Sequence, residues 1–183
     1  TYVLGGGSFA LLSLWGSAAW NWGKEGVKFG FGTEKWFDKD SYTGGADKIG
    51  HMFSLYIQKR TLHWLFMNMG WELDTANLYS LLIAEGLGIA LEIGDGFSSY
   101  RFAFDDLVVD TIGVVFAYFL DKYPHLDQLM GFRIEWWPSK EYLSPRNPDK
   151  TDISSDYNGM KFYYSLKAAG VPKLNQSIWT RYL

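Results

Sequence analysis

The fold is decided by an apolar stretch in the middle of the chain, which reads DTANLYSLLIAEGLGIALEIGD from Asp74 to Asp95. The stretch holds no proline, so nothing interrupts the backbone hydrogen bonds of a helix. Its acidic residues Glu85, Glu92 and Asp95 recur at helical spacing and therefore share one face. We predict a helix over about residues 75–94, with Asp74 as its N-cap and an acidic face on an otherwise apolar surface.

Proline placement extends this helical prediction to most of the chain. All five prolines lie after residue 123, and proline is excluded from helix interiors. Residues 24–46 are predicted as a loop because they are rich in glycine and end on Gly44–Gly45. Further helices are predicted over about residues 2–23, 47–70 and 105–123, the last stopped by Pro124.

The pattern changes after Pro124. Apolar and polar residues alternate over 130–137 and 160–167, and a third such run begins at 178–183, which is typical of half-buried strands. We therefore predict a mainly α protein, with a four-helix bundle over residues 1–123 and a small antiparallel β appendage at the C-terminus, in a strand-rich tail with proline-containing loops over 124–183. Because open sheet edges invite pairing, we expect the tail to dock onto another surface; the alternative is a tail folded back on the helices.

Composition excludes several classes of site. The 183 residues include no cysteine, which removes disulfides, zinc–thiolate sites, iron–sulfur clusters and cysteine nucleophiles. The net charge of −3 argues against a surface that binds polyanions, and we expect no nucleic-acid partner. The aromatic content of 19% is high, and amphipathic Trp and Tyr favour interfaces. We expect the partners to be membrane lipid, protein subunits of a larger assembly, or both.

The first predicted helix carries no charge over residues 2–23, a length that matches the roughly 20 residues of a bilayer crossing. Trp15, Trp20 and Trp22 gather near its end, where the interfacial belt of a membrane helix lies. We expect this helix to contact lipid or a hydrophobic partner surface; the alternatives are a buried core helix and a cleaved signal peptide.

The second predicted helix carries Lys59 and Arg60 at its middle. A lipid-facing charge at that depth costs at least about 2.5 kcal/mol. Either these side chains face a polar interior, or the helix lies outside the hydrocarbon layer. His63, which is flanked by apolar residues, is expected to be packed or interfacial.

Three of the predicted helices carry a polar face, and these faces contain the candidate site. Asp47 and His51 lie four residues apart, as do Asp106 and Asp110. Because uncompensated buried charge is costly, carboxylates on apolar helices pair, become protonated or bind a metal. We expect one polar region between the second, third and fourth helices, as either a structural network or a functional cavity. The candidate catalytic residues are Asp47, His51, Glu92, Asp95 and Asp106, and the candidate binding residues are Lys48, Glu85, Ser98, Arg101 and Asp110.

The spacing of these residues does not match a known metal-binding pattern. One histidine among carboxylates lacks the paired Glu-x-x-His arrangement of di-iron bundles. We therefore predict no metal site and no cofactor from the sequence.

Three strings of the sequence together resemble a known family: residues 41–51 (SYTGGADKIGH), 92–98 (EIGDGFS) and 104–113 (FDDLVVDTIG). Over about residues 15–123 the chain resembles the bacterial envelope family of predicted periplasmic lipoproteins of the YfiM type, a domain of unknown function. It is more distantly similar to VanZ-like membrane proteins, which share an Asp-Lys-x-x-His start, a mid-chain Glu and a later Asp-x-x-x-Asn-x-x-Gly. Asp110 stands where that pattern has Asn, and no lipobox cysteine is present. The resemblance implies an envelope location and a shared polar cluster, but no reaction.

The sequence thus favours a membrane-associated protein of the bacterial cell envelope, at the inner membrane or the periplasmic face of the outer membrane. The leading interpretation is a non-catalytic structural or binding subunit of a larger assembly or lipid surface. The alternative is an envelope enzyme that acts on a lipid or cell-wall precursor, with a carboxylate and His51 as its general acid–base pair. A solvent-connected cavity at the polar region would favour the enzyme, and a closed, fully paired cluster would favour the structural role.

Overall fold

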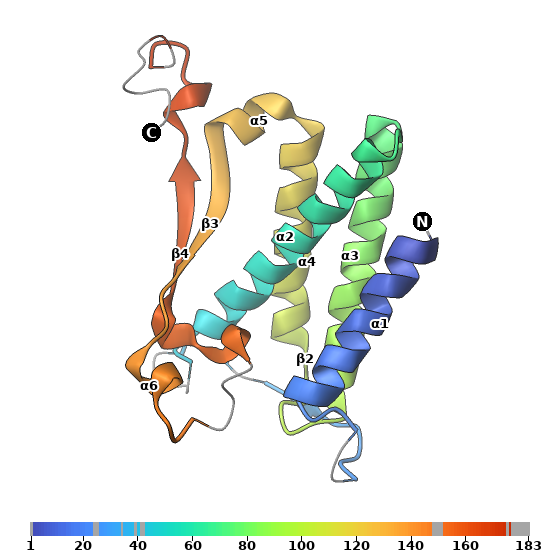
Figure 1. Cartoon of the computed structure of the whole chain (residues 1–183), viewed down its shortest axis with the longest axis vertical. Coiled ribbons are helices and arrows are strands. Elements are labelled where there is room, and N and C mark those ends of the chain that lie inside the picture. Colours follow the sequence, from blue (N-terminus) through green and yellow to red (C-terminus); the bar gives the residue numbers. More distant parts are fainter. Residues whose placement is uncertain are drawn as a thin grey trace.

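The protein is mainly helical, with two small β-sheets. The computed structural model describes residues 2–23, 26–33, 35–38, 40, 43–147, 152–174 and 176. Its four long helices run close to the predicted bounds, and Figure 1 shows their arrangement. They are α1 (Tyr2–Ala19), α2 (Ala46–Asn68), α3 (Leu73–Gly96) and α4 (Phe104–Lys122).

Local signals set most of the helix ends. α2 begins after Gly45 and ends before Gly70, and both glycines have a positive φ, of 85° and 83°, which only glycine adopts readily. α4 ends one residue before Tyr123–Pro124, as the proline requires. The predicted N-cap of α3 is wrong. The cap position is Glu72, and Asp74 lies inside the first turn, where a carboxylate still interacts favourably with the helix dipole.

Helices α2, α3 and α4 pack against one another and form the centre of the protein. Leu55, Leu87 and Val114, one from each helix, are buried together. α4 approaches α2 closely at Gly113, where a Cβ atom would lie 2.1 Å from the carbonyl oxygen of Met52. α1 lies along α3 (Figure 1). The predicted four-helix bundle is therefore not confirmed, because α1 packs chiefly on one of the other three helices.

The tail forms a hairpin that packs back on the helices. Strands β3 (Met130–Trp136) and β4 (Met160–Leu166) pair antiparallel, as predicted. The buried ring of Phe132 contacts Phe53 and Tyr56 of α2. The predicted third run, 178–183, lies outside the described residues. Short helices flank the strands: α5 (Pro124–Leu129), α6 (Lys140–Leu143), η1 (Ile153–Ser155), η2 (Tyr157–Gly159) and η3 (Ala168–Gly170).

A second, smaller sheet was not predicted. Strand β1 (Phe31–Gly32), inside the predicted loop, pairs in parallel with β2 (Phe102–Ala103), which directly precedes α4. The rings of Phe31 and Phe104 stack next to this pair. The sheet holds the start of α4 next to the chain that leads into α2, and both helices bring charged residues to that end of the molecule.

The surface of the helices is unusually apolar. Between residues 43 and 123, all of which the structure describes, Glu72 and Asp74 are the only acidic or basic side chains that are fully exposed. Among the described residues, α3 is the one helix long and apolar enough to cross a membrane. The apolar part of α1, Val3–Ala19, is shorter than the span predicted from residues 2–23.

Candidate functional site

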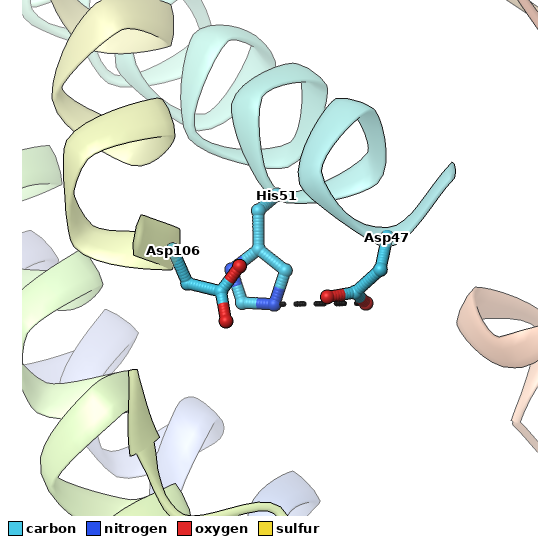
Figure 2. Close-up of side chains that lie close together, drawn as sticks. All are labelled: Asp47, His51 and Asp106. Carbon is cyan, nitrogen blue, oxygen red and sulfur yellow. Dashed lines mark ion pairs between the residues drawn. The ribbon is translucent and has the colours of Figure 1, made fainter. Parts of the chain in front are cut away.

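A buried cluster of charged side chains lies where the start of α2, the end of α3 and the start of α4 meet. α2 contributes three side chains, α3 two and α4 three. Figure 2 shows three of them, Asp47, His51 and Asp106, with their polar atoms directed toward one another. The full set is Asp47, Lys48, His51, Glu92, Asp95, Asp105, Asp106 and Asp110.

Lys48 pairs with the carboxylates at the start of α4. Its side chain is only 1% exposed, and its Nζ lies 2.6 Å from Asp106 Oδ1 and 3.3 Å from Asp105 Oδ2. Asp47 Oδ2 is a third neighbour, at 3.7 Å. A buried ammonium group is stable only with such partners. Lys48 therefore ties the first turn of α4 to the first turn of α2.

His51 lies among three other carboxylates. Its Nδ1 is 3.3 Å from Asp110 Oδ1 and 3.9 Å from Glu92 Oε1, and its Nε2 is 4.0 Å from Asp47 Oδ1. Burial alone lowers the pKa of His51, but the surrounding carboxylates, Asp110 first, outweigh burial and raise the pKa to about 10. With these groups alone, His51 is an imidazolium at neutral pH.

Glu92 is almost completely buried. Its Oε2 accepts a hydrogen bond of 2.9 Å from the backbone N–H of Ala103, whereas its Oε1 has no hydrogen-bond partner. Burial is the main cause that raises the pKa of Glu92 to about 8. A carboxyl group with such a pKa is able to hold a proton at neutral pH.

Asp95 and Asp47 receive partners from distant parts of the chain. The indole Nε1 of Trp22 donates a 2.7 Å hydrogen bond to Asp95 Oδ1, and burial raises the pKa of Asp95 to about 6. The hydroxyl of Tyr157 donates to Asp47 Oδ1. Trp22 was predicted to lie in an interfacial belt, and this hydrogen bond instead turns it toward the cluster.

The other two tryptophans of that predicted belt behave differently from each other. Trp20 donates a 3.2 Å hydrogen bond to Asp152 Oδ2, which connects the end of α1 to the tail. Trp15 stays exposed on α1. An interfacial position thus remains open for Trp15 alone.

The candidate binding residues divide into three groups. Lys48 and Asp110 belong to the cluster. Glu85 lies at its margin, where it accepts a 3.2 Å hydrogen bond from Thr111 and where burial raises its pKa. Ser98 and Arg101 lie outside the cluster: Ser98 donates to the carbonyl of Asp95 and ends α3, and Arg101 Nη1 donates to the carbonyl of Lys28.

The cluster holds more negative than positive groups. Its six carboxylates, Asp105 included, face two bases, Lys48 and His51. If all were ionised, the excess would be four negative charges (six minus two). Burial of this excess is costly, so the cluster binds protons or a cation.

Two hollows in the part of the chain that the structure describes are lined by residues other than His51. One hollow, of about 280 Å³, has Asp105 at its edge and is otherwise lined by residues such as Trp36, Phe104 and Val108. The cluster is mostly buried, although His51 and Asp47 keep 17% and 13% of their side chains exposed. It is not fully paired, however, because Glu92 Oε1 and both oxygens of Asp110 have no hydrogen bond.

A second buried network explains the charges at the middle of α2. Lys59 is fully buried, and its Nζ lies 2.8 Å from Asp121 Oδ2 and donates to Asn77. Arg60 Nε lies 3.1 Å from Asp121 Oδ1, and its Nη1 lies 2.7 Å from Asp127. Of the two predicted alternatives, the structure has the polar interior. Sequence spacing along single helices did not reveal this network.

Comparison with known proteins gives one family. No curated protein and no solved structure matched the chain. The finer resemblances, to the YfiM type and to VanZ-like proteins, stay predictions. From residue 33 to residue 122, a stretch that contains the whole charged cluster, the chain matches the model of a family described as predicted periplasmic lipoprotein (DUF2279), and similarity to this family is consistent with a place in the cell envelope.

Proposed function

We propose that this protein is a membrane-associated, non-catalytic component of the bacterial cell envelope that inserts one side of its helical surface into lipid. The observation that carries the proposal is the distribution of side chains on α1, α3 and α4. α1 carries no charged residue, the charged residues of α3 and α4 other than Asp74 are at least partly buried, and the outward faces of all three helices are apolar. In a water-soluble helix the two faces are the other way round.

The outward faces can be followed along each helix. On α3, Leu78, Leu82, Ile89 and Ile93 are exposed and recur at helical spacing. Exposed apolar patches larger than a few hundred Å² mark membrane or protein contacts. Such a surface gains about 25 cal/mol for each Å² removed from water. The matching exposed residues are Val108, Ile112, Val115 and Phe119 on α4, and Val3, Leu11, Leu14 and Trp15 on α1.

The opposite side of the molecule carries exposed charges, although Trp137 and Leu166 are exposed there as well. The outer face of the hairpin carries exposed Arg133, Glu135 and Lys161. In Figure 1 the hairpin and α1 lie on opposite sides of the central helices. A protein with one apolar side and one charged side fits insertion into one leaflet better than a complete crossing. The family description supports a membrane of the envelope as the place.

Flotation with liposomes tests the proposal. The purified chain is expected to float with phospholipid vesicles, and Leu82→Glu is expected to reduce the floated fraction, because it places a charge on the lipid-facing side of α3. Leu166→Glu is the matched control: Leu166 is 82% exposed, but it lies on β4. Equal effects of both substitutions, or a chain that stays with the soluble fraction, would overturn the proposal.

One observation favours the second candidate, an envelope enzyme that acts on a lipid or cell-wall precursor. His51 and Asp47 keep some exposure, with 17% and 13% of their side chains accessible, as does Asp95. A histidine and a carboxylate at this distance are the minimum for acid–base catalysis. Because most of the cluster is buried, this is the weaker of the two candidates.

A further inference from the structure

Three atoms of the cluster, of the kinds that bind metal ions, lie close together and form no hydrogen bond. His51 Nδ1, Glu92 Oε1 and Asp110 Oδ1 are each buried and without a hydrogen bond, and they lie within 4.8 Å of one another. Asp110 Oδ2 has no hydrogen bond either. Native proteins leave few buried polar atoms unsatisfied, and each such atom calls for an explanation. Here the unsatisfied atoms come from three helices and converge on one point.

The neighbouring group of three, Asp47, His51 and Asp106, differs in its charge balance, although Asp106 Oδ1 is also buried without a hydrogen bond. Asp106 Oδ1 lies 2.6 Å from the ammonium of Lys48, and Asp47 accepts a hydrogen bond from Tyr157. Their charge is already compensated by protein groups. The negative charge that Lys48 does not compensate therefore lies on the other side of the imidazole, between Glu92 and Asp110.

We propose that His51 Nδ1, Glu92 Oε1 and Asp110 Oδ1 bind a single divalent transition-metal ion, with Zn²⁺ the best fit. The sequence did not predict this site, because the metal-binding pattern considered there places two ligands on the same helix. The fold instead supplies one ligand each from α2, α3 and α4.

The distances fit an ion of this size. Zn²⁺ binds nitrogen and oxygen ligands at about 2.0–2.2 Å, so tetrahedral geometry separates two ligand atoms by about 3.4 Å. The imidazole nitrogen lies 3.3 Å from Asp110 Oδ1 and 3.9 Å from Glu92 Oε1. All three atoms lie within 4.8 Å of one another, so rotation of the two carboxylates would be needed to bring them onto one ion. Three protein ligands leave a fourth position for water or another ligand.

The surroundings also suit a bound cation. The carboxylate excess of the cluster falls when a doubly charged ion enters. Asp47 Oδ1, 4.0 Å from His51 Nε2, is placed to orient the imidazole from its far side, as carboxylates near metal-bound histidines do. Gly88 leaves the room that Asp110 occupies, because a Cβ atom there would lie 3.3 Å from Asp110 Oδ2.

Zinc titration of the tag-free, chelator-treated full chain tests the site. Calorimetry and elemental analysis are expected to give one Zn²⁺ per chain, with binding far stronger than that of Mg²⁺, because magnesium disfavours imidazole ligands. Glu92→Gln and Asp110→Asn keep the side-chain shape but remove a ligand. Each is expected to weaken binding by more than the roughly 10–100-fold typical of losing a partner of a ligand.

The control is Asp95→Asn, which removes the same charge from the same cluster but no ligand. It is expected to keep zinc affinity within a few-fold of the unchanged chain. Equal losses in Asp95→Asn and Asp110→Asn would show general attraction to acidic groups and would overturn the proposal, as would the absence of stoichiometric zinc.

Two further measurements control for misfolding and check the coordination geometry. Circular dichroism establishes that each variant is folded. Co²⁺ in place of Zn²⁺ is expected to give the visible absorption of a tetrahedral ion, and a spectrum like that of aqueous Co²⁺ would count against the site. The proposal is independent of the membrane proposal, because the zinc ligands face inward whereas flotation depends on the outward face of α3.

Discussion

His63 is a buried base close to other charges. Its side chain is 8% exposed, and its Nδ1 has no hydrogen-bond partner. Burial is the main cause that lowers the pKa of His63 from 6.5. Asp121 opposes this effect, while Lys59 and Arg60 add to it. His63 was predicted to be packed or interfacial, and the structure buries it; its lowered pKa favours the neutral form at neutral pH.

This pKa shift predicts an acid-dependent loss of stability. Because the folded pKa lies below 6.5, the unfolded chain takes up the proton first, so the free energy of unfolding falls as pH drops below about 6.5 and continues to fall until the folded pKa is passed. We expect urea unfolding at pH 7 and pH 5 to show a larger decrease for the unchanged chain than for His63→Gln. The difference is less than the about 1.4 kcal/mol per pH unit that one full proton gives.

The decrease in unfolding free energy between pH 7 and pH 5 has to be compared between the two chains, because the charged cluster around His51 contributes to it in both. Equal pH slopes for the two chains would show that His63 does not carry this dependence.

At the scale of elements, the contact of α2 with α4 depends on Gly113. A Cβ atom at this position would lie 2.1 Å from the carbonyl oxygen of Met52 and 3.0 Å from its carbonyl carbon. Backbone atoms cannot move aside as a flexible side chain does. We expect Gly113→Ala to separate the two helices and to lower the free energy of unfolding by about 1–3 kcal/mol, the usual range for overpacking.

The matched control for this substitution is Gly6→Ala on α1, where no atom lies within 4 Å of the added Cβ. Alanine is favoured over glycine inside a helix by about 1 kcal/mol, so this variant is expected to be as stable as the unchanged chain or more stable. Urea midpoints of the three chains measure both effects. A Gly113→Ala chain as stable as Gly6→Ala would contradict the close approach.

The elements differ in how well sequence reasoning found them. Helix ends followed from glycine and proline, which act within a few residues, and strands β3 and β4 followed from their period of two. Strands β1 and β2 are two residues long each, too short to show a period. The position of α1 could not be predicted from local patterns either, because an apolar helix can lie in a core, on a partner or in lipid.

The candidate site shows the same limit. Spacing placed Asp47, His51, Glu92, Asp95 and Asp106 on inward faces, and the structure brings them together. It missed Asp105, which is off the four-residue spacing that joins Asp106 to Asp110. In the structure Asp105 and Asp106 both reach Lys48 from the first turn of α4. Trp22 and Tyr157 were missed because their hydrogen bonds join segments far apart in the chain, which no local pattern records.

At the scale of the whole molecule, the absence of cysteine makes the membrane orientation measurable. Single cysteines introduced at exposed positions report their surroundings through labelling with a water-soluble maleimide. In liposomes, Leu11→Cys on α1 and Ile89→Cys on α3 are expected to be protected, because their side is inserted. Leu166→Cys on the hairpin is expected to react as fast as in detergent-free buffer.

The pattern of protection separates the possible arrangements. Protection of all three positions would indicate a molecule surrounded by lipid, and equal labelling of all three would contradict insertion of the α1–α3 side. Leu166→Cys labelled without lipid serves as the control for reactivity.

The pairing of Lys48 with Asp105 and Asp106 has a consequence for biogenesis. Translation delivers α2 first, so the ribosome presents Lys48 and Lys59 well before it has synthesised the carboxylates of α4 that neutralise them. A nascent α2 is therefore a cationic segment that lipid rejects. We therefore expect α2 to enter the membrane-bound fold only after α4 has been synthesised and its carboxylates have paired with Lys48 and Lys59.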